Sequence, residues 1–160
     1  MSPFAVPRDR RHFEDYLAGD VHDCGQLSVA ETDIVQFARR YDPQTMHVDA
    51  AAAATGAFGG LIASGWHTTA LVMRQFVDHY LPGAASLASP GVDELRWPHP
   101  VRPGDTLHVR VFVLDATPSR RRPDRGVVRA RVEARNQDGD LVLSLVAMSI
   151  LLKRSLSTPG

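Results

Sequence analysis

The stretch that decides the fold is Ser64-Gly-Trp-His-Thr-Thr-Ala-Leu-Val-Met-Arg-Gln-Phe-Val-Asp-His-Tyr-Leu81, followed by Pro82-Gly83. Ser64 is suited to cap a helix, and Pro82 with Gly83 ends one, so the sequence predicts a long helix over residues 65–81. A helix with this much apolar circumference is expected to be largely enclosed. Its apolar side chains recur at helical spacing: Trp66, Ala70, Leu71, Val72, Met73, Phe76, Val77, Tyr80 and Leu81.

After this helix the spacing of apolar residues changes to two. Residues 92–97 predict a short strand, and residues 107–113 and 128–134 alternate apolar with polar side chains. Residues 136–139 predict a hairpin turn. Residues 141–152 are apolar on both faces, which is typical of a central strand. One long helix followed by antiparallel strands predicts an α+β fold, with the sheet wrapped around the helix.

Shorter elements are expected before the long helix. Residues 21–29 are a weak strand candidate, and residues 31–41 have the apolar side and the acidic first turn of a helix. Pro43 disfavours helical geometry at the residue before it, so this helix should end at Asp42. Asp49 is placed to cap a short helix over residues 50–54.

The composition limits the possible partners. At 160 residues the chain is expected to form one domain over 1–160, with residues 1–11 flexible. Lys plus Arg and Asp plus Glu number 18 each, so no net charge attracts nucleic acid or an anionic membrane.

Other features point to a cytoplasmic protein. Cys24 is the single cysteine, which excludes an intrachain disulfide and fits a reducing compartment. The first residues lack the apolar run of a signal peptide, and no stretch of about 18 apolar residues predicts a membrane span. The histidines are scattered without metal-ligand spacing, so no metal site is expected.

An acid and an imidazole five residues apart are the strongest candidates for chemistry. Asp42 and His47 lie in what reads as a Pro-containing loop shortly before the long helix. The histidine can accept a proton near neutral pH, and a partly buried Asp can orient water or hold the imidazolium. Each residue alone is more often a turn-former or a satisfied polar group; the pair together favours an acid/base role.

Gly65, at the start of the long helix, has two possible roles. It either permits tight packing there or leaves the free N–H groups of the helix open to a substrate carbonyl, as an oxyanion hole does. The adjacent Ser64, Trp66 and His67 are predicted to contact the substrate, with a core or interface role as the alternative for His67.

Three further patterns do not define a site. Gly59-Gly60 lacks the strand and spacing of a dinucleotide fingerprint. Ser64 lacks the G-x-S-x-G context of a serine hydrolase. The basic segment 120–125 joins two strands and is either a solvated loop or a contact for a phosphate group.

The chain resembles the MaoC-like dehydratases, which include the (R)-specific enoyl-CoA hydratases of the hotdog fold. The resemblance is strongest in residues 37–69 and in Trp97-Pro-x-Pro-Val-x-Pro-Gly-Asp105. The family's hydratase motif pairs an Asp with a His five residues later, as in Asp42 and His47. Its thioester-binding glycine falls 18 residues after the His, which is the place of Gly65.

One departure from the family motif stands out. The hydratase motif reads Asp-x-Asn-Pro-x-His, whereas this chain has Pro43 two positions earlier and Gln44 at the place of the Asn. The hydrogen bonds of this loop are therefore expected to differ from those of the family motif.

The resemblance implies a hotdog domain that forms at least a dimer, with its pocket at the subunit interface and no metal or redox cofactor. The implied substrate is an acyl-CoA or acyl-carrier-protein thioester. The implied reaction is reversible hydration of a trans-2-enoyl thioester to the (R)-3-hydroxyacyl thioester. Asp42 and His47 would activate water, and Gly65 would bind the carbonyl. Two alternatives remain open: an acyl-CoA thioesterase, and a non-catalytic acyl-thioester binder or structural subunit.

Overall fold

The computed structural model describes residues 4–155, and its elements follow the predicted order with additions. In chain order they are η1 (Arg8–Arg10), η2 (Phe13–Asp15), β1 (Val21–Ser28), α1 (Glu31–Tyr41), α2 (Thr45–Val48), α3 (Ala50–Ala54), α4 (Gly65–Gln75), the π-helical η3 (Phe76–Tyr80), β2 (Ser86–Ala88), β3 (Val92–Arg96), β4 (Thr106–Pro118), β5 (Arg125–Arg135) and β6 (Leu141–Leu152).

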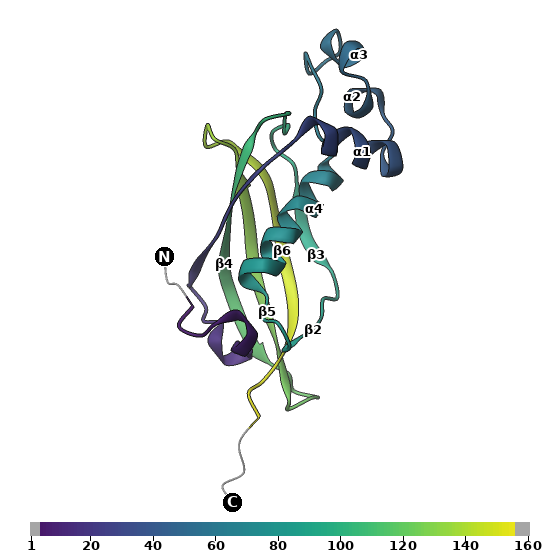
Figure 1. Ribbon diagram of the computed structural model, residues 1–160. Helices are drawn as coiled ribbons and strands as arrows, with labels where there is room; N and C mark the ends of the chain where they lie inside the picture. The colour runs from purple at the N-terminus through teal and green to yellow at the C-terminus, as the bar shows by residue number, and fades with distance from the viewer. Residues whose placement is uncertain (1–3, 156–160) are drawn as a thin grey trace, which may run out of the picture.

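The strands form one antiparallel sheet that curls around α4 (Figure 1). The strand order is β1-β4-β5-β6-β2, and β3 also pairs with β6. β6 therefore has neighbours on both sides, as its two apolar faces predict. The α+β architecture, with the sheet wrapped around the long helix, is confirmed. Among residues 4–155, no helix is long and apolar enough to cross a membrane.

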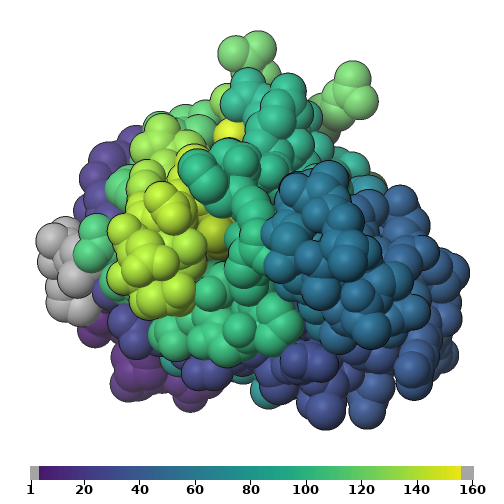
Figure 2. Space-filling model, turned by 90° about the horizontal axis from the view of Figure 1, so that it is seen from above, coloured from purple at the N-terminus to yellow at the C-terminus, as the bar shows by residue number. Residues whose placement is uncertain are grey.

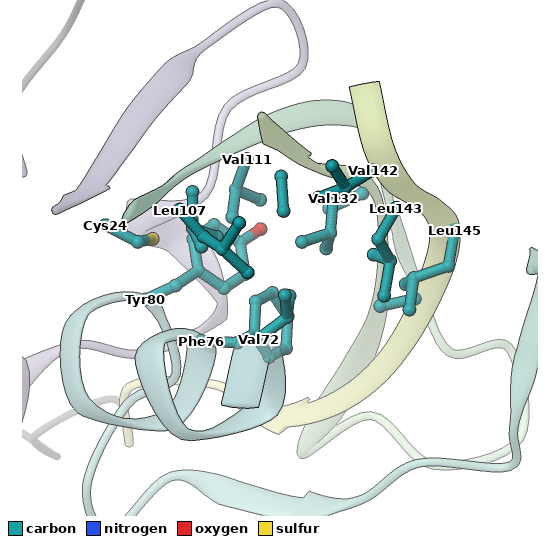
Figure 3. Close-up of a cluster of buried hydrophobic side chains, with 14 of the residues drawn as sticks. Cys24, Val72, Phe76, Tyr80, Leu107, Val111, Val132, Val142, Leu143 and Leu145 are labelled. Atoms are coloured by element: carbon teal, nitrogen blue, oxygen red, sulfur yellow. The ribbon is translucent and has the colours of Figure 1, made fainter. Parts of the chain in front are cut away.

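The hydrophobic core fills the space between the helix and the concave face of the sheet (Figure 3). α4 and its π-helical extension contribute one line of buried side chains, and alternate residues of β4, β5 and β6 meet them. Each fully buried aliphatic or aromatic side chain contributes about 1.5–3 kcal/mol through removal from water. The facing residues are Val72, Phe76 and Tyr80 from the helix and Leu107, Val111, Val132, Leu143 and Leu145 from the strands.

The prediction that the helix is largely enclosed is wrong for a single chain. Trp66 is 59% exposed and Met73 is 48% exposed, and Ala70 between them is exposed as well. One curled sheet covers only one side of a helix, so the apolar residues on the other side stay uncovered. We call this uncovered line of Trp66, Ala70 and Met73 the α4 stripe.

Four short elements, η1, η2, β2 and α2, were not predicted from the sequence. β2 has only three residues, too few to show a period of two. The segment around His47 reads as a loop, but Thr45–Val48 forms the single helical turn α2. The predicted caps are confirmed, since the Asp49 side chain accepts a hydrogen bond from Ala52 N and the Ser64 side chain accepts one from Trp66 N.

The N-terminal arm, residues 4–16, packs against the end of the helix that lies far from α1. Arg8 Nε donates to the carbonyl oxygens of Val77 (2.8 Å) and Leu81 (3.1 Å). Arg11 Nη1 donates to His79 O at 2.8 Å. These cations satisfy carbonyls that a helix end leaves without partners. Residues 4–11 thus have defined contacts, and the expected flexibility of residues 1–11 stays a prediction; residues 1–3 lie outside the described residues.

Replacing Arg8 by Met should lower the free energy of unfolding by about 1–3 kcal/mol, because two charge-assisted hydrogen bonds to the helix end are lost. Denaturant unfolding measures this value. Arg10→Met is the matched control, since Arg10 is exposed in the same turn and its side chain makes no hydrogen bond among the described residues. Equal unfolding free energies for the two variants would contradict this role of the arm.

Candidate active site

The candidate residues gather at the end of the molecule that carries α1, α2 and α3 (Figure 1). Asp42 lies at the C-terminal end of α1, His47 lies in α2, and Gly65 is the first residue of α4. Seen from above, the α2–α3 segment lies beside the segment between β3 and β4 (Figure 2). Arg102 Nη2 donates to Phe58 O at 2.7 Å across this boundary.

Pro43 forms the centre of a tight turn that begins at Asp42. Gln44 N donates to Asp42 O at 2.8 Å, which closes a three-residue turn. Proline suits this position because its ring fixes φ and it has no N–H to leave unsatisfied. The turn also returns the Gln44 side chain to Asp42, and Gln44 Nε2 donates to Asp42 Oδ1 at 2.7 Å.

His47 is buried, with 5% of its surface exposed. Its Nδ1 lies 2.8 Å from the carbonyl oxygen of Ile62. A carbonyl oxygen only accepts hydrogen bonds, so Nδ1 carries the proton and Nε2 of the neutral ring keeps its lone pair. Nε2 lies 3.5 Å from Asp42 Oδ2. The basic nitrogen of the imidazole and one carboxylate oxygen therefore face the same small space.

The surroundings of Asp42 favour its ionised form. Hydrogen bonds from Gln44 and from Ser64, and to a lesser extent the charge of His47, lower the pKa of the Asp42 carboxyl below its ordinary value. Ser64 Oγ donates to Asp42 Oδ2 at 2.7 Å. Donors stabilise the carboxylate more than the neutral acid, which is the cause of the shift. Asp42 is thus an anion at neutral pH.

Ser64 joins the carboxylate to the start of α4. The residue is fully buried, and its Oγ accepts the Trp66 N–H at 3.3 Å while it donates to Asp42. Its role as the helix cap is confirmed. The predicted substrate contact is not supported by this geometry, because the hydroxyl is buried and its O–H already donates a hydrogen bond to Asp42.

Gly65 lies beside His47 in a cavity of about 250 Å³, whose wall also includes Trp97. As the first residue of α4, Gly65 has an N–H without an acceptor inside the helix. A Cβ at Gly65 would overlap the six-membered ring of Trp97. The packing role of this glycine agrees with the structure, since its bare Cα admits the indole. Its binding of a substrate carbonyl stays a prediction.

A network of hydrogen bonds holds Trp97 over this glycine. Trp97 Nε1 donates to Thr69 Oγ1 at 3.1 Å, and Thr69 Oγ1 donates to Gly65 O at 2.8 Å. The Trp66 ring meets the Trp97 ring edge to face, with centroids 5.3 Å apart. Trp97 lies within the motif that carries the family resemblance, but nothing in the sequence alone places its ring on Gly65.

Trp66 lines a second cavity of about 430 Å³ between α4, β2, β3 and β6. This volume is in the range of small-molecule sites. The cavity wall is largely apolar and includes residues of the α4 stripe. The paired indoles lie at the boundary of the two cavities, because Trp97 lines the smaller one and Trp66 the larger one. The wall of the larger cavity includes Ala70, Met73, Phe76, Leu87, Leu145 and Ala147.

His67 lies away from both cavities. Its ring stacks on Phe37 of α1, with centroids 5.0 Å apart and an angle of 24° between the rings. Burial, partly opposed by the charge of Asp33, lowers the pKa of His67 below its ordinary value. His67 thus joins α1 to α4 as a neutral core residue, and the geometry does not support the predicted contact with substrate.

Comparisons with known proteins agree with this fold and site. The family model described as "MaoC like domain" matches residues 17–136. Uncharacterized protein YdeM of Bacillus subtilis (strain 168) is 33% identical over 141 residues, which are 88% of this chain and 98% of YdeM. The crystal structure of the MaoC-like dehydratase from Rhodospirillum rubrum has 43% identity and a TM-score of 0.85, covering 91% of this chain and 99% of that chain.

The (R)-hydratase PhaJ1 from Pseudomonas aeruginosa is also similar in structure. It has 29% identity and a TM-score of 0.67, covering 93% of this chain and 94% of that chain. The chain therefore belongs to the MaoC-like dehydratase family and has its hotdog fold. The N-terminal arm precedes the residues that the family model matches.

Replacing Gly65 by Ala should lower the free energy of unfolding by about 1–3 kcal/mol and shift the tryptophan fluorescence, because the new methyl group displaces the Trp97 ring. Chemical unfolding followed by fluorescence measures both effects. Gly60→Ala is the matched control, because its Cβ would meet only Arg102 Nη1 at 3.5 Å, an ordinary contact. A Gly65→Ala protein as stable as wild type, with unchanged fluorescence, would refute the packing of Trp97 on Gly65.

The lowered pKa of His67 predicts a stability loss on the acid side. The unfolded chain takes up a proton near the ordinary histidine pKa of about 6.5, before the folded protein does. Stability is therefore complete above this pH and falls as the pH drops toward the lowered value. Melting temperatures at pH 7 and pH 5 should differ less for His67→Phe than for wild type. The exposed His79→Phe control should retain the wild-type difference; an equal difference in all three proteins would disprove the assignment.

Proposed function

We propose that the protein catalyses reversible hydration of a trans-2-enoyl thioester to the (R)-3-hydroxyacyl thioester. The observation that carries the proposal is the pairing of His47 Nε2 with Asp42 Oδ2, 3.5 Å apart, beside the first residue of α4. This arrangement combines a proton acceptor, a fixed negative charge and the positive end of a helix. Addition of water to a conjugated thioester requires a base and a site for developing negative charge.

In the forward reaction, one water molecule contacts both Asp42 Oδ2 and His47 Nε2, to the side of the line that joins these two atoms. His47 Nε2 takes a proton from the water as its oxygen bonds to C3 of the substrate. The electron pair of the C2–C3 double bond moves toward the thioester carbonyl, which becomes an enolate-like oxygen. The imidazolium then returns a proton to C2. One water molecule is added across the double bond, and the enzyme regains its starting protonation state.

The two residues have different tasks in this scheme. Asp42 stays an anion, orients the water and stabilises the imidazolium that forms. The Gly65 N–H stabilises the enolate-like oxygen, and one such donor lowers the transition state by about 3 kcal/mol. The larger cavity, on the other side of the indole pair, takes the acyl tail because its wall is apolar.

The relatives support this reaction class. PhaJ1 carries the description R-hydratase, and the Rhodospirillum rubrum protein is described as a MaoC-like dehydratase. We infer that the thioester arm belongs to CoA or to an acyl-carrier protein. No metal or redox cofactor takes part in the scheme, because the thioester itself acidifies C2. The cytoplasmic location predicted from the sequence stays a prediction.

We also infer that the protein forms at least a homodimer. The α4 stripe exposes a tryptophan and a methionine beside the opening of an apolar cavity. Large exposed apolar surfaces rimmed by polar residues are typical of interaction sites. A second copy of the chain that covers the stripe would complete the enclosure of α4 that its apolar circumference predicts.

A thioesterase and a non-catalytic binder are the alternatives, and one assay separates all three. The purified protein is mixed with crotonyl-CoA, and the conjugated-enoyl absorbance and free thiol are followed together. Loss of absorbance without thiol supports the hydratase. Release of thiol supports the thioesterase, and no change in either signal supports the binder.

Asp42→Asn and His47→Gln should each lower kcat by about 10²-fold or more with little change in KM, since the thioester arm binds elsewhere. The double variant should be hardly worse than the worse single variant, because both residues act on one water. Steady-state kinetics of the three proteins tests this. Asp49→Asn is the matched control, since Asn also caps a helix well and Asp49 caps α3.

Near-wild-type turnover in either single variant would mean that other groups activate the water. Strictly multiplicative losses would mean that Asp42 and His47 act independently. Either result would refute the proposed pair.

A further inference from the structure

Gln44, where this chain departs from the family motif, makes two hydrogen bonds to Asp42. Gln44 binds Asp42 twice, because its backbone N–H donates to Asp42 O at 2.8 Å and its side-chain Nε2 donates to Asp42 Oδ1 at 2.7 Å. The shifted proline makes this possible, since the turn centred on Pro43 folds the next side chain back over the carboxylate. Gln44 is itself exposed, so it fills no space in the core.

Ser64 holds the other carboxylate oxygen. Its Oγ donates to Asp42 Oδ2 at 2.7 Å, and the hydroxyl proton is committed to this bond because the same oxygen accepts the Trp66 N–H. Each oxygen of the carboxylate therefore has its own donor, one from the turn after α1 and one from the start of α4. Rotation of the carboxylate would break both hydrogen bonds.

His47 does not by itself fix the carboxylate. Its Nε2 lies 3.5 Å from Asp42 Oδ2, beyond the usual length of a hydrogen bond between nitrogen and oxygen. The His47 ring is oriented by Ile62 O on its other side. The carboxylate and the imidazole are thus positioned by separate sets of partners.

We propose that Gln44 and Ser64 are positioning residues that clamp the Asp42 carboxylate, one on each oxygen, so that Oδ2 faces His47 Nε2. The catalytic consequence of this clamp rests on the proposed hydration reaction. The clamp itself does not, because it acts on a carboxylate whose state is measurable without a substrate. Both donors also favour the anion, which agrees with the direction of the Asp42 pKa shift.

The test replaces Gln44 by Met, which is similar in length but has no donor. The pKa of Asp42 is measured by NMR of protein labelled with ¹³C at the aspartate carboxyl groups, with Asp42→Asn to assign the signal. The pKa should rise toward the ordinary value of about 3.9. The kcat should fall by about tenfold, with KM nearly unchanged. Gln36→Met is the matched control, since Gln36 is exposed on α1 and its side chain makes no hydrogen bond among the described residues.

Two further variants separate positioning from a merely structural role. Gln44→Glu has the same shape but places a negative charge beside Asp42, so it should raise the Asp42 pKa more than Gln44→Met does. Ser64→Ala removes the second donor, and it should also raise this pKa, although loss of the helix cap lowers stability as well. Combining Gln44→Met with Ser64→Ala should raise the pKa further than either change alone.

The outcomes distinguish the clamp from the reaction. An Asp42 pKa that is the same in wild type, Gln44→Met and Gln44→Glu overturns the clamp, whatever the activity. A raised pKa in these variants supports the clamp even if wild type hydrates no enoyl thioester, a result that would overturn only the proposed function. A raised pKa with unchanged kcat in an active enzyme would overturn the catalytic role of the positioning.

Discussion

The hydrogen bond from Ser64 Oγ to Asp42 Oδ2 joins two segments on which the site depends. Asp42 lies at the end of α1, and Ser64 caps α4, so this contact fixes the Asp42 carboxylate relative to the helix start at Gly65. The curled sheet fixes α4 through its buried face, and the N-terminal arm holds the far end of the same helix. The position of the carboxylate therefore follows from the packing of the whole domain.

The two sides of α4 have different surroundings. The side that carries Val72 packs into the core, whereas the α4 stripe borders the larger cavity and remains uncovered in one chain. Trp97 lies between the cavities over Gly65, at a position where a side chain on that residue would collide with the indole. The requirement for glycine at the helix start thus has a packing cause that does not depend on the proposed binding of a carbonyl.

Much of the fold could be predicted because its signals are local. The change of apolar spacing after α4, the caps at Asp49 and Ser64 and the turn at Gly139 depend on neighbouring residues, and the structure agrees with them. The pairing of Asp42 with His47 was predicted from spacing together with the family resemblance. Contacts between segments that are distant in the sequence could not be predicted in this way. The packing of the Trp97 indole on the start of α4 was therefore missed. Apolar periodicity also does not tell whether the chain or a partner covers a face, so the enclosure of α4 was overestimated.

We propose that water is added to C3 of an enoyl thioester, and isotope labelling tests this step most directly. Crotonyl-CoA is incubated with the protein in H₂¹⁸O. The products are separated on a chiral column, and their masses are determined by mass spectrometry. We expect (R)-3-hydroxybutyryl-CoA with one ¹⁸O at C3 and an intact thioester. A free carboxylic acid carrying ¹⁸O in its carboxyl group, together with free CoA, would identify attack on the carbonyl carbon and refute hydration at C3.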